Sequence, residues 1–273
     1  MPDRIGRDRM LMNKQRTPIW RRLRVSTAPY RVRFGTIPGL LCWASLQREK
    51  LLPKGRLFPV QVPGYTAKIW LRAGSSDRQV FDEIVTGNEL DFELPVQPKR
   101  VLDLGANIGL SSVYLANRYP EARILSLEVD SGNVDVLRRN TNSYKNITIV
   151  PKAVWSQNGY VRIINPHEDS WAFRVTAAKA DDDGAIEAIS IKTLLENHGW
   201  PDVDLVKMDI EGAEFDLLDH YESSEWISRV SVLAVELHDR FRPGCTAAFS
   251  KATQNYHARL QSRASYTVAY LDR

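Results

Sequence analysis

Two pairs of charged residues stand inside apolar segments, where they are best placed to do chemistry. Lys207 and Asp209 alternate in one segment, and Glu236 and His238 alternate in another. Side chains on a β-strand point to its two faces in turn, so the members of each pair share a face. Because an unpaired buried charge is costly, we expect Lys207 to pair with Asp209, Asp103 or Glu236. A purely structural network of ion pairs is the alternative for Lys207 and Glu236.

Asp209, Glu211 and His238 are the candidate catalytic residues. They fall at or beyond the carboxyl ends of predicted strands, where open α/β sheets bind their ligands. Histidine titrates near neutral pH, so His238 can accept a proton once a carboxylate orients its ring, and Asp209 can be that carboxylate or the base itself. The same side chains could hold Mg²⁺ or Ca²⁺. We do not favour that alternative, and we assign no metal ligand.

The segment Val101–Gly109 predicts a cofactor site. An apolar run, Val101–Leu104, leads into a loop with Gly105 and Gly109, and a predicted helix, Leu110–Tyr119, follows. Strand, loop and helix in this order form the first unit of a doubly wound α/β fold. The two glycines let the backbone turn sharply and approach a ligand without a Cβ in the way, and the helix start offers unpaired N–H groups.

The loop favours S-adenosylmethionine over a dinucleotide. Asn107 occupies the position of the middle glycine that a pyrophosphate requires, and Asp103 suits a ligand with an amino group. Glu128 ends the next predicted strand 23 residues after Gly105, close to the spacing at which an acidic residue binds ribose hydroxyls, and Asp130 is the second choice. The residues predicted to bind the cofactor are Asp103, Gly105, Ala106, Asn107, Gly109, Glu128, Val129, Ala153 and Asp209.

Charge divides the chain into unequal parts. Residues 1–56 hold 14 Lys and Arg against 3 Asp and Glu, whereas residues 57–273 hold 23 against 30. We predict a basic N-terminal extension over 1–56, a hairpin and helix over 57–97, and a cofactor-binding domain over 98–273. The acidic domain argues against a nucleic-acid substrate. The basic extension, with its apolar residues, could contact an anionic membrane, although we favour a partly disordered, solvated segment.

The remaining pattern predicts a mostly parallel, twisted sheet with helices on both faces. Its further strands are expected at 122–128, 147–154, 186–191, 204–209, 230–238 and 266–271, with a helix near 247–260. Asn158-Gly159 predicts a tight turn into a returning strand. Residues 165–184 read as a long loop, in which Trp171 and Phe173, together with Glu236, are predicted to bind the substrate.

The cysteine content and the length of the apolar runs indicate in which cellular compartment the protein resides. Cys42 and Cys245 offer neither a disulfide framework nor zinc-ligand spacing, which favours a cytoplasmic protein, peripheral at the inner membrane if the extension binds lipid. The longest apolar run, Gly39–Leu46, is far shorter than the roughly 18 residues that span a bilayer. Nothing in the sequence indicates an oligomeric state.

Three segments together resemble the FkbM-type methyltransferases, which have the class I S-adenosylmethionine-dependent, Rossmann-like fold. They are Asp103-Leu-Gly-Ala-Asn-Ile-Gly109, Asp204-Leu-Val-Lys-Met-Asp-Ile-Glu-Gly-Ala-Glu214 and Val235-Glu-Leu-His238. The resemblance covers roughly residues 58–245. It implies O-methylation of a hydroxyl on a sugar, glycan, glycolipid or secondary metabolite. Val129 departs from the proline that often follows the ribose-binding Glu in this family, and the last hairpin of the class I sheet is not evident.

Other functions stay open at this point. An N-methyltransferase would share the cofactor, but the Asn/Asp-Pro-Pro-Tyr/Phe loop that such enzymes often use is absent from Asp209–Gly212. A nicotinamide oxidoreductase would share the fold but needs the missing glycine. A protein that binds S-adenosylmethionine without catalysis is the alternative from a different class.

Overall fold

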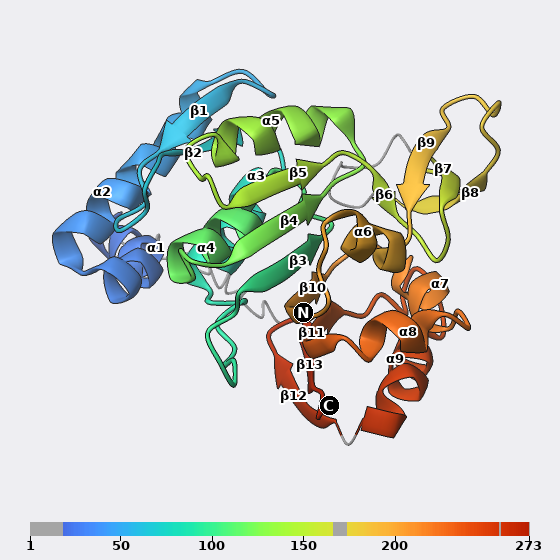
Figure 1. Cartoon of the computed structure of the whole chain (residues 1–273). Helices are drawn as coiled ribbons and strands as arrows, with labels where there is room; N and C mark the ends of the chain where they lie inside the picture. Colours follow the sequence, from blue (N-terminus) through green and yellow to red (C-terminus); the bar gives the residue numbers. More distant parts are fainter. Residues whose placement is uncertain (1–18, 166–173, 257, 273) are drawn as a thin grey trace, which may run out of the picture.

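A seven-stranded sheet forms the centre of the computed structural model, which describes residues 19–165, 174–256 and 258–272 (Figure 1). Five neighbouring strands are parallel, in the order β5, β4, β3, β10, β11. Their bounds are β3 (Arg100–Leu104), β4 (Arg123–Leu127), β5 (Ile147–Val150), β10 (Val203–Met208) and β11 (Val230–Glu236). The predicted mostly parallel α/β sheet is therefore confirmed.

Helices cover both faces of this sheet, because consecutive residues of each parallel strand pack on opposite sides. In β3, Val101 packs with the apolar cluster that includes residues of α4 and of the N-terminal elements, whereas Leu102 packs with the cluster of α6, α8 and α9. The helices are α4 (Leu110–Arg118), α5 (Ser131–Thr141), α6 (Ile191–Asn197), α7 (Glu214–Leu218), α8 (Ser223–Ile227) and α9 (Cys245–Thr253).

The N-terminal elements belong to the folded core. They are α1 (Ile19–Phe34), α2 (Thr36–Leu46), η1 (Gln47–Leu51), β1 (Leu57–Val60), β2 (Ile69–Arg72), α3 (Asp77–Phe81) and η2 (Asp82–Thr86). The predicted hairpin is confirmed as the antiparallel pair β1–β2. The expected solvated extension is wrong for its described part, because Tyr30, Cys42 and Leu46 are buried in the main apolar cluster. Gly39 lets the helices meet closely, since a Cβ there would lie 2.3 Å from the Tyr30 carbonyl oxygen.

A smaller four-stranded sheet lies beside the carboxyl end of β5, with the order β6, β9, β7, β8 (Figure 1). Its strands are β6 (Ala153–Val154), β7 (Gly159–Ile163), β8 (Val175–Ala178) and β9 (Ile186–Ile189). The single strand predicted over 147–154 is wrong, because Pro151 lacks an N–H donor and separates β5 from β6. The expected loop 165–184 contains β8, and β7 pairs with β8 and β9 rather than with β6.

The far edge of the main sheet is an antiparallel hairpin of β12 (Arg259–Arg263) and β13 (Tyr266–Tyr270), with β13 beside β11. The helix predicted near 247–260 is too long: α9 ends at Thr253, and the short helix η4 (Gln254–Tyr256) follows. Strand β12 escaped prediction because an edge strand needs no apolar face, and Leu260 is its only large apolar residue.

The strand order creates a crevice at the carboxyl ends of β3 and β10. From β3 the chain adds β4 and β5 on one side, and it later adds β10 and β11 on the other. Connections leave these strand ends in opposite directions, which opens a space for a ligand. No helix in the described ranges is long and apolar enough to cross a membrane.

Candidate active site

The loop after β3 turns through backbone conformations that favour glycine. The φ angles of Gly105, Asn107 and Gly109 are 77°, 50° and 85°. A Cβ on Gly105 would lie 1.8 Å from the carbonyl oxygen of Asp209, and one on Gly109 would lie 2.4 Å from Cδ1 of Leu137. The glycines are thus needed for close approach to β10 and α5. The predicted sharp turn is confirmed, and the sequence did not reveal this additional packing requirement.

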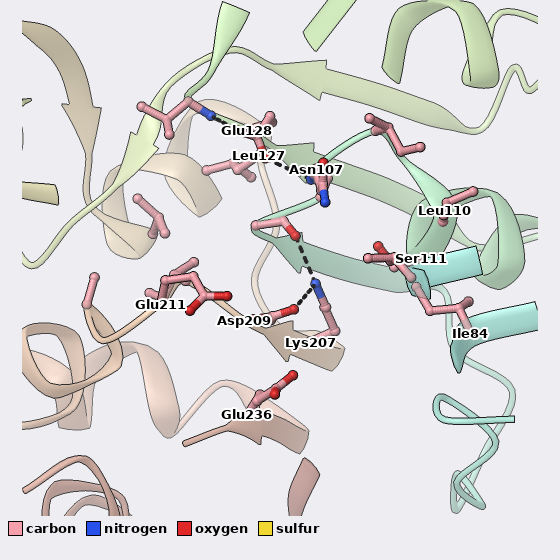
Figure 2. A pocket seen from close by; sticks show the side chains of 18 of the residues that line it. Ile84, Asn107, Leu110, Ser111, Leu127, Glu128, Lys207, Asp209, Glu211 and Glu236 are labelled. Atoms are coloured by element: carbon pink, nitrogen blue, oxygen red, sulfur yellow. Dashed lines mark hydrogen bonds and ion pairs between the residues drawn. The ribbon is translucent and has the colours of Figure 1, made fainter. Parts of the chain in front are cut away.

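Glu128 joins this loop to the end of β4. Its carboxylate accepts hydrogen bonds from the backbone N–H groups of Asn107 (2.7 Å), Val129 (2.9 Å) and Asp130 (2.9 Å). Burial raises the pKa of Glu128, and the three N–H donors oppose that rise. Because a carboxylate has about four acceptor positions, capacity remains for a ligand hydroxyl. Glu128 and Asn107 line the same side of a cavity at this end of the sheet, which is described below (Figure 2).

Asp103 and Lys207 form a buried pair beneath the loop. The Nζ of Lys207 donates to the carbonyl oxygen of Gly105 (2.9 Å) and lies 3.3 Å from Asp103 and 3.6 Å from Asp209. Asp103 also accepts a hydrogen bond from the Ser111 hydroxyl (2.6 Å). The predicted pairing of Lys207 is confirmed for Asp103 and Asp209. Asp103 is fully buried and does not line the cavity, so its predicted contact with a ligand amino group is corrected to a supporting role.

His238 is buried outside the cavity lining and faces four carboxylates. Its Nδ1 donates to Oε1 of Glu214 at 3.0 Å. Its Nε2 lies 3.6 Å from Oε2 of Glu211, 3.7 Å from Oε1 of Glu236 and 3.8 Å from Oδ1 of Asp209. The side chain of His238 is only 3% exposed, whereas those of Asp209 and Glu236 are 29% and 26% exposed.

The charges around His238 change its chemistry. Burial alone would lower the pKa of His238, but the hydrogen bond to Glu214 and the charges of Asp209 and Glu211 raise it to about 9. The ring is then protonated at neutral pH and does not fit the predicted role of base. Burial, with the charge of Asp209, raises the pKa of Glu211 to about 8 and that of Glu236 to about 7.

A cavity of about 310 Å³ connects these groups. It has the size at which pockets enclose a small-molecule ligand. The predicted residues that line it are Gly105, Ala106, Asn107, Glu128, Val129, Ala153, Asp209, Glu211 and Glu236. Gly109 and His238 do not line it. Trp171 and Phe173 lie outside the described residues, so their predicted substrate contacts stay predictions.

The cavity has walls that sequence reasoning missed. Glu83 and Glu89, which precede the main sheet, line it together with Tyr266 of β13. The hydroxyl of Ser265 donates to Glu89 (2.6 Å) and lies 3.1 Å from Oε2 of Glu236, so the hairpin turn joins these walls. No local pattern links these segments, because they meet only through the tertiary fold.

Glu214 is the missed residue that a sequence signal could have revealed. It is fully buried, and besides His238 it accepts hydrogen bonds from the N–H groups of Ile210 (2.9 Å) and Gly212 (2.7 Å). An acidic residue at the start of a helix, directly after a glycine turn, commonly accepts such bonds. Glu214 therefore holds both the turn after β10 and the ring of His238.

Comparison with known proteins identifies methyltransferases. The family model described as the Methyltransferase FkbM domain matches residues 103–260. The chain is 27% identical over 181 residues to Methyltransferase sdnD of Sordaria araneosa, covering 54% of this chain and 70% of that protein. A solved FkbM methyltransferase from Methylobacillus flagellatus KT matches with a TM-score of 0.45 at 19% identity, over 64% of this chain and 44% of that one. An O-methyltransferase from Bacillus cereus, in complex with SAH, matches with a TM-score of 0.45 at 11% identity, over 91% and 97%.

Proposed function

Since the chain belongs to the FkbM methyltransferase family, whose model matches more than half of it, we propose that it methylates a hydroxyl group of a sugar, glycan, glycolipid or secondary metabolite. The observation that carries this proposal is the position of Asp209, a partly exposed carboxylate on the cavity wall beside the glycine loop. An alkyl hydroxyl is a weak nucleophile at neutral pH, so its methylation needs a group that takes the proton.

The residues around the cavity fit S-adenosylmethionine. The carboxylates lining it outnumber the basic side chains; they are Glu83, Glu89, Glu128, Asp209, Glu211 and Glu236, against Lys152, Lys207 and Arg240. Lys207 is already engaged by Asp103 and Asp209. The raised pKa of Glu211, about 8, leaves that group largely protonated at neutral pH, but the other acidic side chains still outnumber Lys152 and Arg240. A phosphate would therefore meet surplus negative charge, whereas a sulfonium and an amino group would be attracted. Glu128, Asn107 and the loop backbone would hold the cofactor, which supplies the methyl group when bound.

Lys207 and the loop prepare Asp209 to accept the proton of the acceptor hydroxyl. Lys207 bridges Asp209 and the Gly105 carbonyl, so the carboxylate has a fixed position at the end of β10. The other face of Asp209 is open to the cavity, where a substrate hydroxyl can reach it. A base in this position contributes about 10²–10⁴-fold to the rate. Fixed geometry supplies much of the remaining acceleration by aligning the reacting atoms.

Methylation of an amine is the second candidate, favoured by the same surplus of carboxylates, which would attract a cationic acceptor. A screen of the full chain with S-adenosylmethionine, sugars, glycans, other alcohols and amines distinguishes the two candidates. Mass spectrometry should detect the added methyl group on a hydroxyl compound. Methylation of amines alone would overturn our choice.

We also propose that α1 and α2 hold the enzyme against an anionic membrane. The side chains of Val25, Val32, Ile37 and Leu41 are exposed. They belong to α1 and α2, which lie side by side (Figure 1). Residues 25–56 contain six Lys or Arg and one acidic residue. Apolar side chains on a basic surface suit the headgroup region of anionic lipids. Tyr30 and Cys42 fix these helices to the core, so the lipid-facing surface belongs to the folded protein.

A further inference from the structure

The Nε2 atom of His238 faces three carboxylates and makes no hydrogen bond with any of them. Three carboxylate oxygens, from Asp209, Glu211 and Glu236, lie 3.6–3.8 Å away. These separations exceed the 2.7–3.2 Å or so of a hydrogen bond from nitrogen to oxygen. Two ligands that each lie about 2.0–2.2 Å from one cation are roughly 3–4 Å apart. The distances from Nε2 to the three carboxylate oxygens are therefore those expected of atoms that bind one cation together.

The opposite side of the ring supports the same interpretation. Nδ1 donates to Glu214, whose carboxylate is held by two backbone N–H groups, and this bond turns Nε2 toward the three carboxylates. Histidines that bind metal ions almost always donate their other N–H to a carboxylate or a carbonyl group. The arrangement orients the imidazole in advance, as a metal ligand requires.

Glu211 supplies an independent observation. It is 7% exposed, and its Oε2 atom is buried and accepts no hydrogen bond. That atom is the one directed at Nε2 of His238. A buried carboxylate oxygen without a hydrogen bond is destabilising, and a cation between it and the ring would satisfy it.

We propose that Asp209, Glu211 and His238 bind a divalent transition-metal ion, with Glu236 as an adjacent oxygen donor. One ligand atom from each of the first three residues lies within 4.8 Å of the others. A mixed set of imidazole and carboxylates suits Mn²⁺ or Zn²⁺ better than Mg²⁺ or Ca²⁺. The carboxylates of Asp209 and Glu211, in the turn after β10, and of Glu236, at the end of β11, also line the cavity (Figure 2).

The site deepens the proposed function and rests on it. An ion at this position would face the space for the acceptor, bind its hydroxyl oxygen and favour loss of the proton to a neighbouring carboxylate. An acceptor with two adjacent hydroxyls, as sugars have, would offer two oxygen donors to the same ion. The imidazole must be unprotonated to bind, so the ion takes the place of the proton on Nε2.

Electron paramagnetic resonance of Mn²⁺ tests the proposal without cofactor or acceptor. Titration of the full, EDTA-treated chain should remove the signal of free Mn²⁺ until one ion is bound per chain. Pulsed measurements should detect coupling to a ¹⁴N nucleus from His238. Glu211→Gln should weaken binding about tenfold or more, the scale of a lost metal-site interaction.

Glu83→Gln is the matched control, because it removes the same charge from another part of the cavity wall. Equal affinity of the two variants, absence of nitrogen coupling or absence of binding by the unsubstituted chain would each overturn the proposal. Far-UV circular dichroism checks that both variants fold, and Asp209→Asn replaces Glu211→Gln if the latter does not. These results are independent of methyl transfer. If the chain binds no Mn²⁺ but methylates hydroxyls, only the proposed metal site is refuted. If it binds Mn²⁺ but methylates only amines, only the proposed acceptor is refuted.

Discussion

Replacing Gly105 by alanine should both destabilise the protein and damage its cofactor site. Gly105 has a φ of 77°, a conformation that costs an L-residue about 1–2 kcal/mol. The new Cβ would lie 1.8 Å from the Asp209 carbonyl oxygen, whereas real Cβ atoms essentially never come within 3.0 Å of such an atom. The two strand ends must therefore separate by more than an ångström.

That separation breaks identifiable interactions. The N–H of Asp209 donates to the Leu104 carbonyl at 3.1 Å, and Lys207 bridges Gly105 and Asp209. Losing one backbone hydrogen bond costs about 1 kcal/mol. With the backbone strain, we expect the free energy of unfolding to fall by about 2–3 kcal/mol.

Gly55→Ala separates the two contributions. Gly55 has a similar φ of 81°, but a Cβ added there would meet nothing within 4 Å. Its substitution should cost only the backbone strain of about 1–2 kcal/mol and leave cofactor affinity unchanged. Urea unfolding and calorimetric titration with S-adenosylmethionine measure both effects. If Gly105→Ala is as stable as Gly55→Ala and binds the cofactor normally, the argument from close strand packing is refuted.

Three further predictions concern the cofactor, the base and the membrane surface. Glu128→Ala should weaken S-adenosylmethionine binding by about 1–3 kcal/mol in calorimetry, because both a ligand contact and the anchor of Asn107 are lost; unchanged affinity would remove Glu128 from the site. Asp209→Asn should lower kcat by about 10²–10⁴-fold while cofactor affinity changes only a few-fold, and near-normal turnover would place the base elsewhere. Combined Ile37→Glu and Leu41→Glu substitutions should abolish sedimentation with phosphatidylserine vesicles and preserve cofactor affinity; equal vesicle binding by the original chain and the variant would reject the membrane role.

The parallel core could be predicted because its signals are local. Runs such as Val101–Leu104 are buried on both faces, and the strand-loop-helix order fixes their direction. The edge strand β12 lacks such a run. The burial of α1 and α2 depends on contacts that Tyr30 and Cys42 make with residues far along the chain. Charge composition gives no measure of such contacts.

Sequence patterns predicted which residues belong to the candidate site better than they predicted what each of these residues does. Alternation placed Lys207 with Asp209 and Glu236 with His238, but the direction of each side chain depends on its partners. Asp103 pairs with Lys207, His238 is hydrogen-bonded to Glu214, and neither Asp103 nor His238 lines the cavity. The spacing of residues along the chain does not reveal these buried partners. The partners determine whether a charged side chain can contact a ligand.

The two halves of the cavity wall come from different parts of the chain, and this has a consequence for how such an enzyme can diversify. The strand ends and the glycine loop surround Glu128, whereas Glu83 and Glu89 come from a segment that precedes the sheet. Substitutions at those two positions leave the hydrogen bonds of Glu128 and the packing of Gly105 untouched. Selection, in nature or in the laboratory, can therefore change the side chains on this side of the cavity while the glycine loop and the contacts of Glu128 stay unchanged.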